Sequence, residues 1–238
     1  LKISLKMSMF ASKVNISSLE KKPIEQRFNP YRDNGGSVIA LAGKGYCVLI
    51  ADTRLGGGYD ILSRNVSKCK QLNSKCIIAA GGMLADRRAL FNVIDARHII
   101  FEHQHFRPMT TQSIAQLVSV TLYSRRFFPY YTFNIVAGID EEGNGQLFGY
   151  DAVGSMEQLP YGVQGTGGVL ATPFLDNQVA CKTHEDDKRD LSLAEAIELL
   201  QDTMTSIAER DIHTGDSAEV WIITEDGIKM EILPLRQD

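Results

Sequence analysis

Residues 35–54 read GGSVIALAGKGYCVLIADTR, and this stretch decides the expected fold. Two short apolar runs, at 37–43 and 46–52, are rich in β-branched residues and are separated by only two residues. A short glycine-containing turn between two such runs predicts an antiparallel β-hairpin. Ser37 opens the hairpin and follows two glycines. This arrangement can mark a self-cleaving junction at which an N-terminal nucleophile is freed.

Outside this hairpin, strand-like and helix-like segments alternate in pairs. Apolar residues at three- and four-residue steps predict helices, whereas short β-branched runs predict strands. The expected helices cover 84–105, 110–127, 169–177 and 192–211, with Thr110 or Thr111 and Ser192 as N-caps. The expected strand pairs are 59–64 with 75–82, 130–140 with 145–154, and 218–224 with 228–235. We therefore expect an α+β fold, a four-layer αββα sandwich of two antiparallel sheets flanked by helices.

The composition suits one globular domain. The chain has 238 residues, of which 44% are hydrophobic and 23% charged. Its net charge of -4 gives no electrostatic case for nucleic-acid or membrane-surface binding. The four cysteines match neither a zinc motif nor a disulfide framework, so we expect reduced structural thiols, no metal and no cofactor. We expect residues 1–35 to be an N-terminal propeptide-like tail and 36–238 to be the single domain.

Four motifs occur in a fixed order along this domain. They are IADTR at 50–54, Lys68 sixteen residues after Asp52, AGGMLAD at 80–86 and ERDIHTGD at 209–216. As an ordered set they resemble the beta-type subunits of the proteasome core particle, which are N-terminal-nucleophile hydrolases. The resemblance covers residues 36–238 and implies the αββα sandwich of that family.

Further segments narrow the resemblance. They are RFNPYRDNGG at 27–36, YSRRFFPYY at 123–131, GIDEEGNG at 138–145 and FLDNQV at 174–179. Together with ERDIHTGD they are similar to the sixth beta-type subunit of eukaryotic core particles, which is non-catalytic in that family.

The resemblance also implies a set of site residues. In active members a threonine hydroxyl attacks the peptide carbonyl, and the threonine's own freed α-amine is the base. A lysine held by aspartates favours the deprotonated hydroxyl, and a backbone N–H of the Gly-Gly turn binds the oxyanion. The supporting positions correspond in this chain to Asp52, Lys68, Gly82, Asp211, Thr214 and Thr166.

The nucleophile position itself is occupied by glycine. In active members it lies sixteen positions before the first aspartate, and here that residue is Gly36. Glycine has no hydroxyl, so the resemblance implies a degenerate site with no catalytic residue, in which Lys68, Asp52 and Asp211 form a structural ion network. Ser37 is one position later, and a one-residue shift along a strand turns a side chain to the opposite face. We therefore expect Ser37 to point away from Lys68. We expect Gly36→Thr, with cleavage after Gly35, to restore partial activity at best.

Three other features have simple structural explanations. His103 and His105 are two residues apart on an expected helix and face different ways, which favours a surface helix end over zinc. The GTGG run at 165–168 lacks the Gly-Lys-[Ser/Thr] sequence of a nucleotide site. The aromatic and basic cluster at 125–131 is interpreted as a packing segment rather than an RNA platform.

The function implied by the resemblance is that of a non-catalytic structural beta subunit of the 20S core particle, in ubiquitin-dependent protein degradation. It would contribute to ring assembly, the chamber wall and neighbouring substrate pockets, in the cytoplasm and nucleus. Its expected partners are the other beta and alpha subunits of the stacked rings and polypeptide substrates in the chamber, with neither nucleic acid nor membrane. Two alternatives stay open. One is an active peptidase that uses Ser37 after cleavage between Gly36 and Ser37, and the other is a free-standing amidohydrolase of the same fold.

Overall fold

The computed structural model describes residues 28–182 and 190–238. All the elements described below lie within the compact unit Tyr31–Asp238. Two residues that precede the expected domain start at 36 contact this unit. The Tyr31 hydroxyl donates a hydrogen bond to the Pro129 carbonyl, and the Asn34 side chain donates one to the Gly56 carbonyl.

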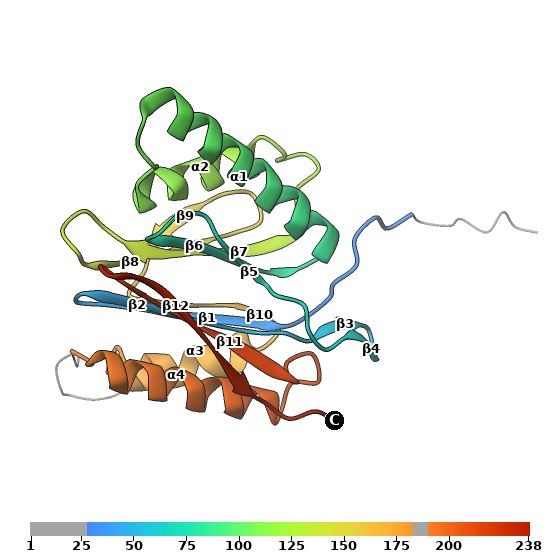
Figure 1. Cartoon of the computed structure of the whole chain (residues 1–238). Helices are drawn as coiled ribbons and strands as arrows, with labels where there is room; N and C mark the ends of the chain where they lie inside the picture. Colours follow the sequence, from blue (N-terminus) through green and yellow to red (C-terminus); the bar gives the residue numbers. More distant parts are fainter. Residues whose placement is uncertain (1–27, 183–189) are drawn as a thin grey trace, which may run out of the picture. The chain divides into compact units, whose positions relative to one another are not determined.

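Two antiparallel sheets lie face to face, and helices cover both outer faces (Figure 1). The first sheet has the order β10-β1-β2-β11-β12, with β1 Ser37–Gly43, β2 Tyr46–Asp52, β10 Tyr161–Gly165, β11 Ser217–Thr224 and β12 Gly227–Pro234. The second has the order β5-β6-β7-β8-β9, with β5 Cys69–Gln71, β6 Cys76–Gly82, β7 Thr132–Ile139, β8 Gly145–Tyr150 and β9 Met156–Gln158. A separate ribbon pairs β3 (Leu55–Gly57) with β4 (Asp60–Ser63).

The helices form the outer layers. They are α1 Leu84–His105, α2 Thr111–Tyr123, α3 Gly168–Gln178 and α4 Leu193–Ala208. One apolar core joins α1 and α2 to the second sheet, and another joins α3 and α4 to the first. The α+β, four-layer αββα sandwich expected from the sequence is thereby confirmed. No helix in the described ranges is long and apolar enough to cross a membrane.

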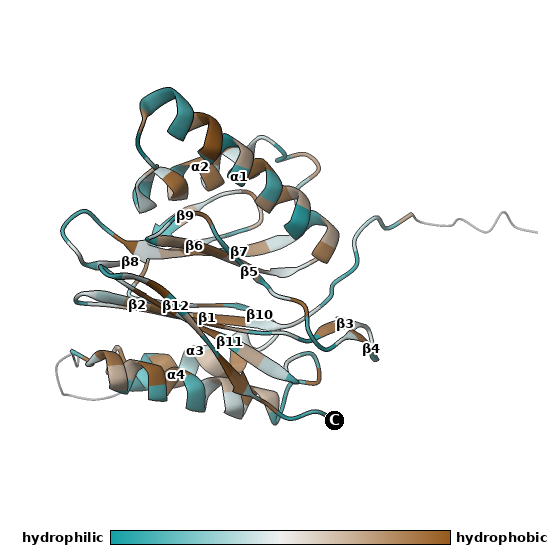
Figure 2. Ribbon diagram, in the orientation of Figure 1, coloured by the Kyte–Doolittle hydropathy of each residue, from teal (hydrophilic) through white to brown (hydrophobic). Residues whose placement is uncertain are grey.

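The opening hairpin is also confirmed, since β1 and β2 pair antiparallel with Ala40 opposite Leu49. Side chains of β1 point alternately to the two faces of the sheet. Ile39 and Leu41 pack in the core that α3 and α4 cover, whereas Val38 and Ala40 pack between the two sheets. Because both faces of β1 and β2 are buried, apolar residues follow one another along most of each of these two strands (Figure 2).

The helix starts follow the predicted caps. Thr110 accepts a hydrogen bond from the backbone N–H of Ser113, and Ser192 forms a capping box with Glu195. Helix α2, however, ends at Tyr123 rather than at 127. The phenylalanines that follow, at 127 and 128, are exposed, so a longer helix would have buried little further apolar surface there.

One expected strand pair is wrong. The segments 59–64 and 75–82 do not pair with each other; β4 pairs with β3, and β6 pairs with β5 and β7. Only Gly58 and Tyr59 separate β3 from β4, and only residues 72–75 separate β5 from β6. Closing these short connections costs less chain entropy than closing the connection over residues 65–74, which the expected pairing would require.

Candidate functional site

Gly36 immediately precedes β1, with a backbone φ of +90° that side chains rarely adopt. A Cβ atom placed on Gly36 would lie 2.1 Å from Lys68 Cε and 2.8 Å from Asp52 Oδ1. The lysine and aspartate therefore converge on Gly36, as the spacing predicted. They also occupy the space that a nucleophilic side chain would need.

The Lys68 ammonium group is fully engaged. Its Nζ donates to the carbonyl oxygens of Asp52 at 2.9 Å and Arg54 at 2.6 Å, and lies 3.1 Å from Asp52 Oδ1. An ammonium has three N–H donors, and these three acceptors use them all. The side chains of Lys68 and Asp52 are only 1% and 0% exposed. In this arrangement Lys68 binds the end of β2 to the segment that leads into β5.

Burial dominates the electrostatics of this pair. It lowers the pKa of Lys68, although the negative charge of Asp52 opposes the shift. Burial likewise raises the pKa of Asp52, against the opposing effects of Lys68 and of the N–H groups of Ser37 and Arg54. Both shifts are caused by the removal of the two groups from water, and in each case the charge of the partner opposes the shift.

Ser37 belongs to a different set of contacts. Its side chain is fully buried, and its Oγ lies 2.7 Å from Thr214 Oγ1 and accepts a hydrogen bond of 2.9 Å from the Gly167 N–H. Thr214 in turn donates to Asp211 at 2.7 Å. Ser37 has the same parity on β1 as Ile39, so its side chain points to the α3 side of the sheet. This is the orientation away from Lys68 that the one-residue shift predicted.

Thr166 contacts both Gly36 and Asp211. Its backbone N–H donates to the Gly36 carbonyl at 3.0 Å, and its hydroxyl donates to Asp211 Oδ2. Gly82 lies on the opposite wall, where its carbonyl accepts from the Asn34 N–H at 3.3 Å. The structure thus places Asp52, Lys68 and Thr166 against Gly36. Thr214 contacts Ser37 and Asp211 contacts Thr166, whereas Gly82 contacts Asn34, two residues before Gly36.

Chemically, this arrangement lacks its central group. Gly36 has no hydroxyl, and its nitrogen is a peptide nitrogen joined to Gly35, so it offers neither a nucleophile nor an amine base. The buried hydroxyls of Ser37 and Thr214 are engaged with each other and with Asp211.

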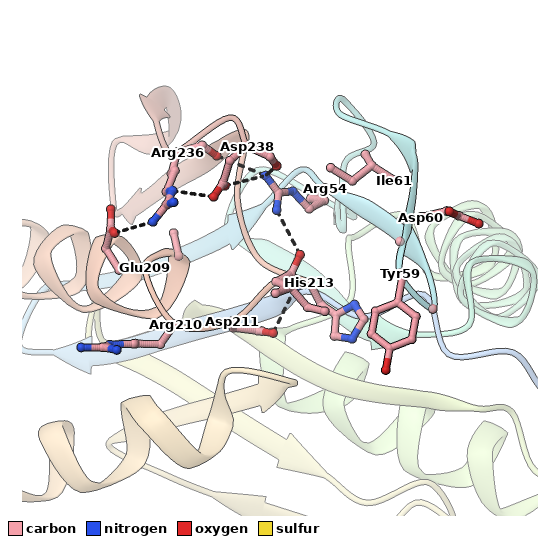
Figure 3. Close-up of a pocket in the computed structure, with 14 residues that line it drawn as sticks. Arg54, Tyr59, Asp60, Ile61, Glu209, Arg210, Asp211, His213, Arg236 and Asp238 are labelled. Atoms are coloured by element: carbon pink, nitrogen blue, oxygen red, sulfur yellow. Dashed lines mark hydrogen bonds and ion pairs between the residues drawn. The ribbon is translucent and has the colours of Figure 1, made fainter.

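A pocket of about 470 Å³ lies beside the Gly36 centre and reaches it only at Asp211 (Figure 3). Arg54, Tyr59, Asp211 and His213 line it together with the C-terminal residues 236 and 238, whereas Gly36, Asp52 and Lys68 do not. Figure 3 shows the His213 ring beside the Tyr59 ring. The Lys68 centre is therefore closed off from this opening.

Comparison with known proteins decides the family. A family model described as "Proteasome subunit" matches residues 32–223. The chain belongs to the proteasome subunit family. It is 48% identical to "Proteasome subunit beta type-1" of Arabidopsis thaliana over 89% of this chain and 97% of that protein. It is 47% identical to the protein of the same name from Petunia hybrida, over 90% of this chain and 98% of that protein. It is a beta-type member of the proteasome family.

The narrower resemblance to a sixth beta subunit is not supported by these names. A "Probable proteasome subunit beta type-6" of Schizosaccharomyces pombe matches 90% of this chain and 99% of that protein, at a lower identity of 39%. The relatives therefore show that this chain is a beta-type proteasome subunit, but they do not show which of the numbered beta subunits it is.

The sequence interpretation missed one buried ion pair of this proteasome subunit. The Arg54 guanidinium donates to both carboxylate oxygens of Asp216, at 2.8 and 3.3 Å, and to the Ile212 carbonyl at 3.0 Å. Arg54 stands in the IADTR motif and Asp216 in the ERDIHTGD motif, so the signal was present in two motifs that were interpreted separately. The pair joins the end of β2 to the loop that precedes β11.

We expect Asp216→Asn to lower the free energy of unfolding by about 1–3 kcal/mol at pH 7, because it weakens charge-assisted hydrogen bonds of a buried arginine. Burial raises the pKa of Asp216, but the hydrogen bonds from Arg54 and Arg64 outweigh it and hold the pKa below its ordinary 3.8. Because the pKa of Asp216 is lower in the folded state, the ionised carboxylate stabilises the folded state at pH values above 3.8. This stabilisation is lost as the pH falls through the pKa that Asp216 has in the folded state. The difference in unfolding free energy between the wild type and Asp216→Asn, measured by urea unfolding, should therefore shrink below about pH 4. A difference that stays constant from pH 7 to pH 3 would contradict the role assigned to this ion pair.

The alternatives weighed for other motifs find no support. His103 and His105 are exposed at the end of α1, and no group of three or more metal-ligating side chains that could hold an ion occurs within residues 28–182 and 190–238. Gly167 is the N-cap of α3, so the GTGG run begins a helix. The rings of Phe128 and Tyr131 pack on Tyr31, which agrees with a packing role for the aromatic segment.

Proposed function

We propose that this chain is a non-catalytic structural subunit of the 20S proteasome core particle. The observation that carries the proposal is Gly36, which occupies the nucleophile position without a hydroxyl and with its nitrogen in a peptide bond. The engaged Lys68 ammonium supports it, because all three N–H groups already have acceptors.

Assembly into rings is supported by the apolar side chains that the single chain leaves exposed. They occur on several elements and include Val169 and Phe174 on α3, Phe127 after α2, and Met230 and Ile232 on β12. Met230 and Ile232 lie two residues apart on the same face of β12, and adjacent exposed apolar side chains of this kind are typical of surfaces that become subunit contacts. The proposed partners are the other beta and alpha subunits and the polypeptide substrates of the chamber. The proposed location is the cytoplasm and nucleus, in ubiquitin-dependent degradation.

The ring position is proposed as the one occupied by the sixth beta subunit. The motifs at 27–36 and 123–131 support this position, and the Schizosaccharomyces pombe relative that carries the name type-6 matches at 39% identity. The plant relatives carry the name type-1 and also match about nine-tenths of the chain. The names type-1 and type-6 both fit this chain if they denote the same ring position. Identifying the neighbouring subunits of this chain in an assembled particle tests the proposed position.

The two alternatives are less well supported. An active site at Ser37 needs a hydroxyl near Lys68, whereas the Ser37 hydroxyl is bound to Thr214 and Gly167. A free-standing amidohydrolase needs a nucleophile at the same centre, and it would show the native mass of a small assembly rather than that of a ring of unlike subunits.

The test uses intact core particles that contain this chain. An electrophilic probe that requires both a hydroxyl and a free α-amine should leave this chain unlabelled, and sequencing should find no chain that begins at Ser37. The particle's peptidase activities should be unchanged in Ser37→Ala, with Ser206→Ala as an exposed control. Labelling of this chain, or loss of one activity in the Ser37 variant with assembly intact, would favour the alternative.

A further inference from the structure

Six consecutive residues at the end of α2, 123–128, are all exposed, and together with Val120 they are called the α2 patch. We propose that the α2 patch binds a segment of a neighbouring, unlike subunit in which carboxylates stand beside apolar side chains. This inference rests on the proposed function, because it requires a particle of unlike subunits. It goes further by assigning one surface of this chain and the chemistry of the partner segment that the surface selects.

Large apolar side chains of the α2 patch are in contact with water in the single chain. Phe127 is 97% exposed, Tyr123 63% and Phe128 59%. Val120 is 54% exposed and lies three residues before Tyr123, so these two side chains share one face of α2. The buried side chains of α2 lie on the opposite face, where they pack in the core with the second sheet. Exposed apolar side chains that adjoin one another in this way are typical of interaction sites.

The chain that follows α2 is held in place by its own contacts. The backbone N–H groups of Arg125 and Arg126 donate to carbonyls of the last turn of α2, at 3.0 and 3.1 Å. The Phe128 N–H donates to the Arg125 carbonyl at 3.0 Å, and the Phe128 ring lies 5.6 Å from the Tyr31 ring. A surface that is already ordered loses less conformational entropy when a partner binds. The α2 patch is therefore prepared for binding although it is exposed.

Two arginines give the α2 patch a positive charge. Arg125 Cζ lies 5.2 Å from the centre of the Tyr130 ring, and Arg126 Cζ lies 5.8 Å from the centre of the Phe127 ring. In the part of the chain that the structure describes, no carboxylate lies within ion-pair distance of either guanidinium group. The sequence gives the reason, because residues 103–139 contain no aspartate or glutamate. The two guanidinium groups are thus able to bind carboxylates from outside the chain.

The charge and the aromatic content of the α2 patch together select the partner. Arginine and tyrosine are enriched among the residues that dominate the binding energy of protein interfaces. A symmetric contact between two copies of this chain would bring four arginines together, and residues 1–27 of the chain are themselves basic, with six Lys and Arg against two Glu. Nucleic acid is disfavoured, because two arginines neutralise few phosphates in a chain of net charge -4. An acidic and apolar protein segment satisfies both the arginines and the exposed rings.

Photocrosslinking in assembled core particles identifies the occupant of the α2 patch. With p-benzoylphenylalanine in place of Phe127, we expect crosslinks to one segment of a neighbouring subunit, with an aspartate or glutamate within a few residues of the crosslink. The same analogue in place of Phe106, which is 92% exposed at the other end of α1, is the matched control and should not crosslink to that segment. Crosslinks from position 127 to a second copy, to residues 1–27 of the same chain, to nucleic acid or to a segment without acidic residues would overturn the proposal, as would the absence of any crosslink.

Charge reversal tests the two arginines. In competition with the wild-type chain, the double variant Arg125→Glu with Arg126→Glu should enter particles about tenfold less often or worse, because like charges would then face each other. Arg107→Glu is the matched control, since Arg107 is an exposed arginine four residues before the start of α2, and it should enter particles like the wild type. Replacing the crosslinked carboxylate of the partner by lysine should restore entry of the double variant. Entry of the double variant at the wild-type level, or no such rescue, would overturn the proposal.

Folding and the proposed function are controlled separately. The substituted side chains are exposed, so the purified variants should unfold at the same urea concentration as the wild type. Phe127→Ala changes no charge and is a second variant, which should enter particles severalfold less often; entry at the wild-type level would contradict the role of the exposed ring. A wild-type chain that enters no particle of unlike subunits would overturn the proposed function itself. Normal particles that contain the charge-reversed chain would overturn only the assignment of the α2 patch.

Discussion

Gly36→Thr is expected to lower the free energy of unfolding by about 2–6 kcal/mol and to yield no peptide hydrolysis. The backbone at Gly36 has a φ of +90°, and the new Cβ would lie 2.1 Å from Lys68 Cε. The substitution therefore adds backbone strain to a steric overlap with a buried side chain. The threonine would also remain in peptide linkage with Gly35, so its nitrogen could not serve as a base.

Gly45→Thr separates the two causes of this loss. Gly45 has a φ of +83° but nothing within 4 Å of the position of its Cβ, so only backbone strain should appear there. We expect it to lower the free energy of unfolding by about 1–3 kcal/mol, less than Gly36→Thr in the same urea titration. Hydrolysis is measured in particles whose catalytic subunits are inactivated. Equal losses at the two glycines, or robust turnover by Gly36→Thr, would contradict the role assigned to Lys68 at this position.

Asp52→Leu is expected to destabilise the fold by about 3–5 kcal/mol, because it leaves the buried Lys68 cation without its carboxylate partner. It also removes the acceptor of the Ser37 and Arg54 N–H groups, which bind Asp52 at 2.7 and 3.1 Å. The change should appear as a lower urea midpoint with an unchanged slope.

The double variant Asp52→Leu with Lys68→Met provides the matched comparison. It removes the uncompensated charge along with the carboxylate, so its destabilisation should be less than the sum of the two single effects. Additive effects would contradict the view that the two side chains form one structural unit. This experiment also tests whether the pair serves folding at a site where glycine occupies the expected nucleophile position.

Much of the fold could be predicted from local patterns. The β1–β2 hairpin follows from two apolar runs around a two-residue turn, and the start of α4 follows from Ser192 and Glu195 at capping-box spacing. The pairing of β4 with β3 could not be predicted in this way, because β3 has only three residues, two of them glycine, and lacks a strand-like pattern. The end of α2 was also missed, since the residues after it remain apolar although they are exposed.

The sequence by itself determined the family and the missing nucleophile. Motif order and the sixteen-residue spacing depend only on position along the chain, and they identify Gly36, Asp52 and Lys68 without coordinates. Only the tertiary structure decided that Gly36 has no room for a side chain and that the Asn34 side chain forms hydrogen bonds with the backbones of Gly56 and Leu84. The reason is that the contacts of Asn34 join residues 22 and 50 positions apart, and no local periodicity reports which distant backbone groups a folded chain brings to one side chain.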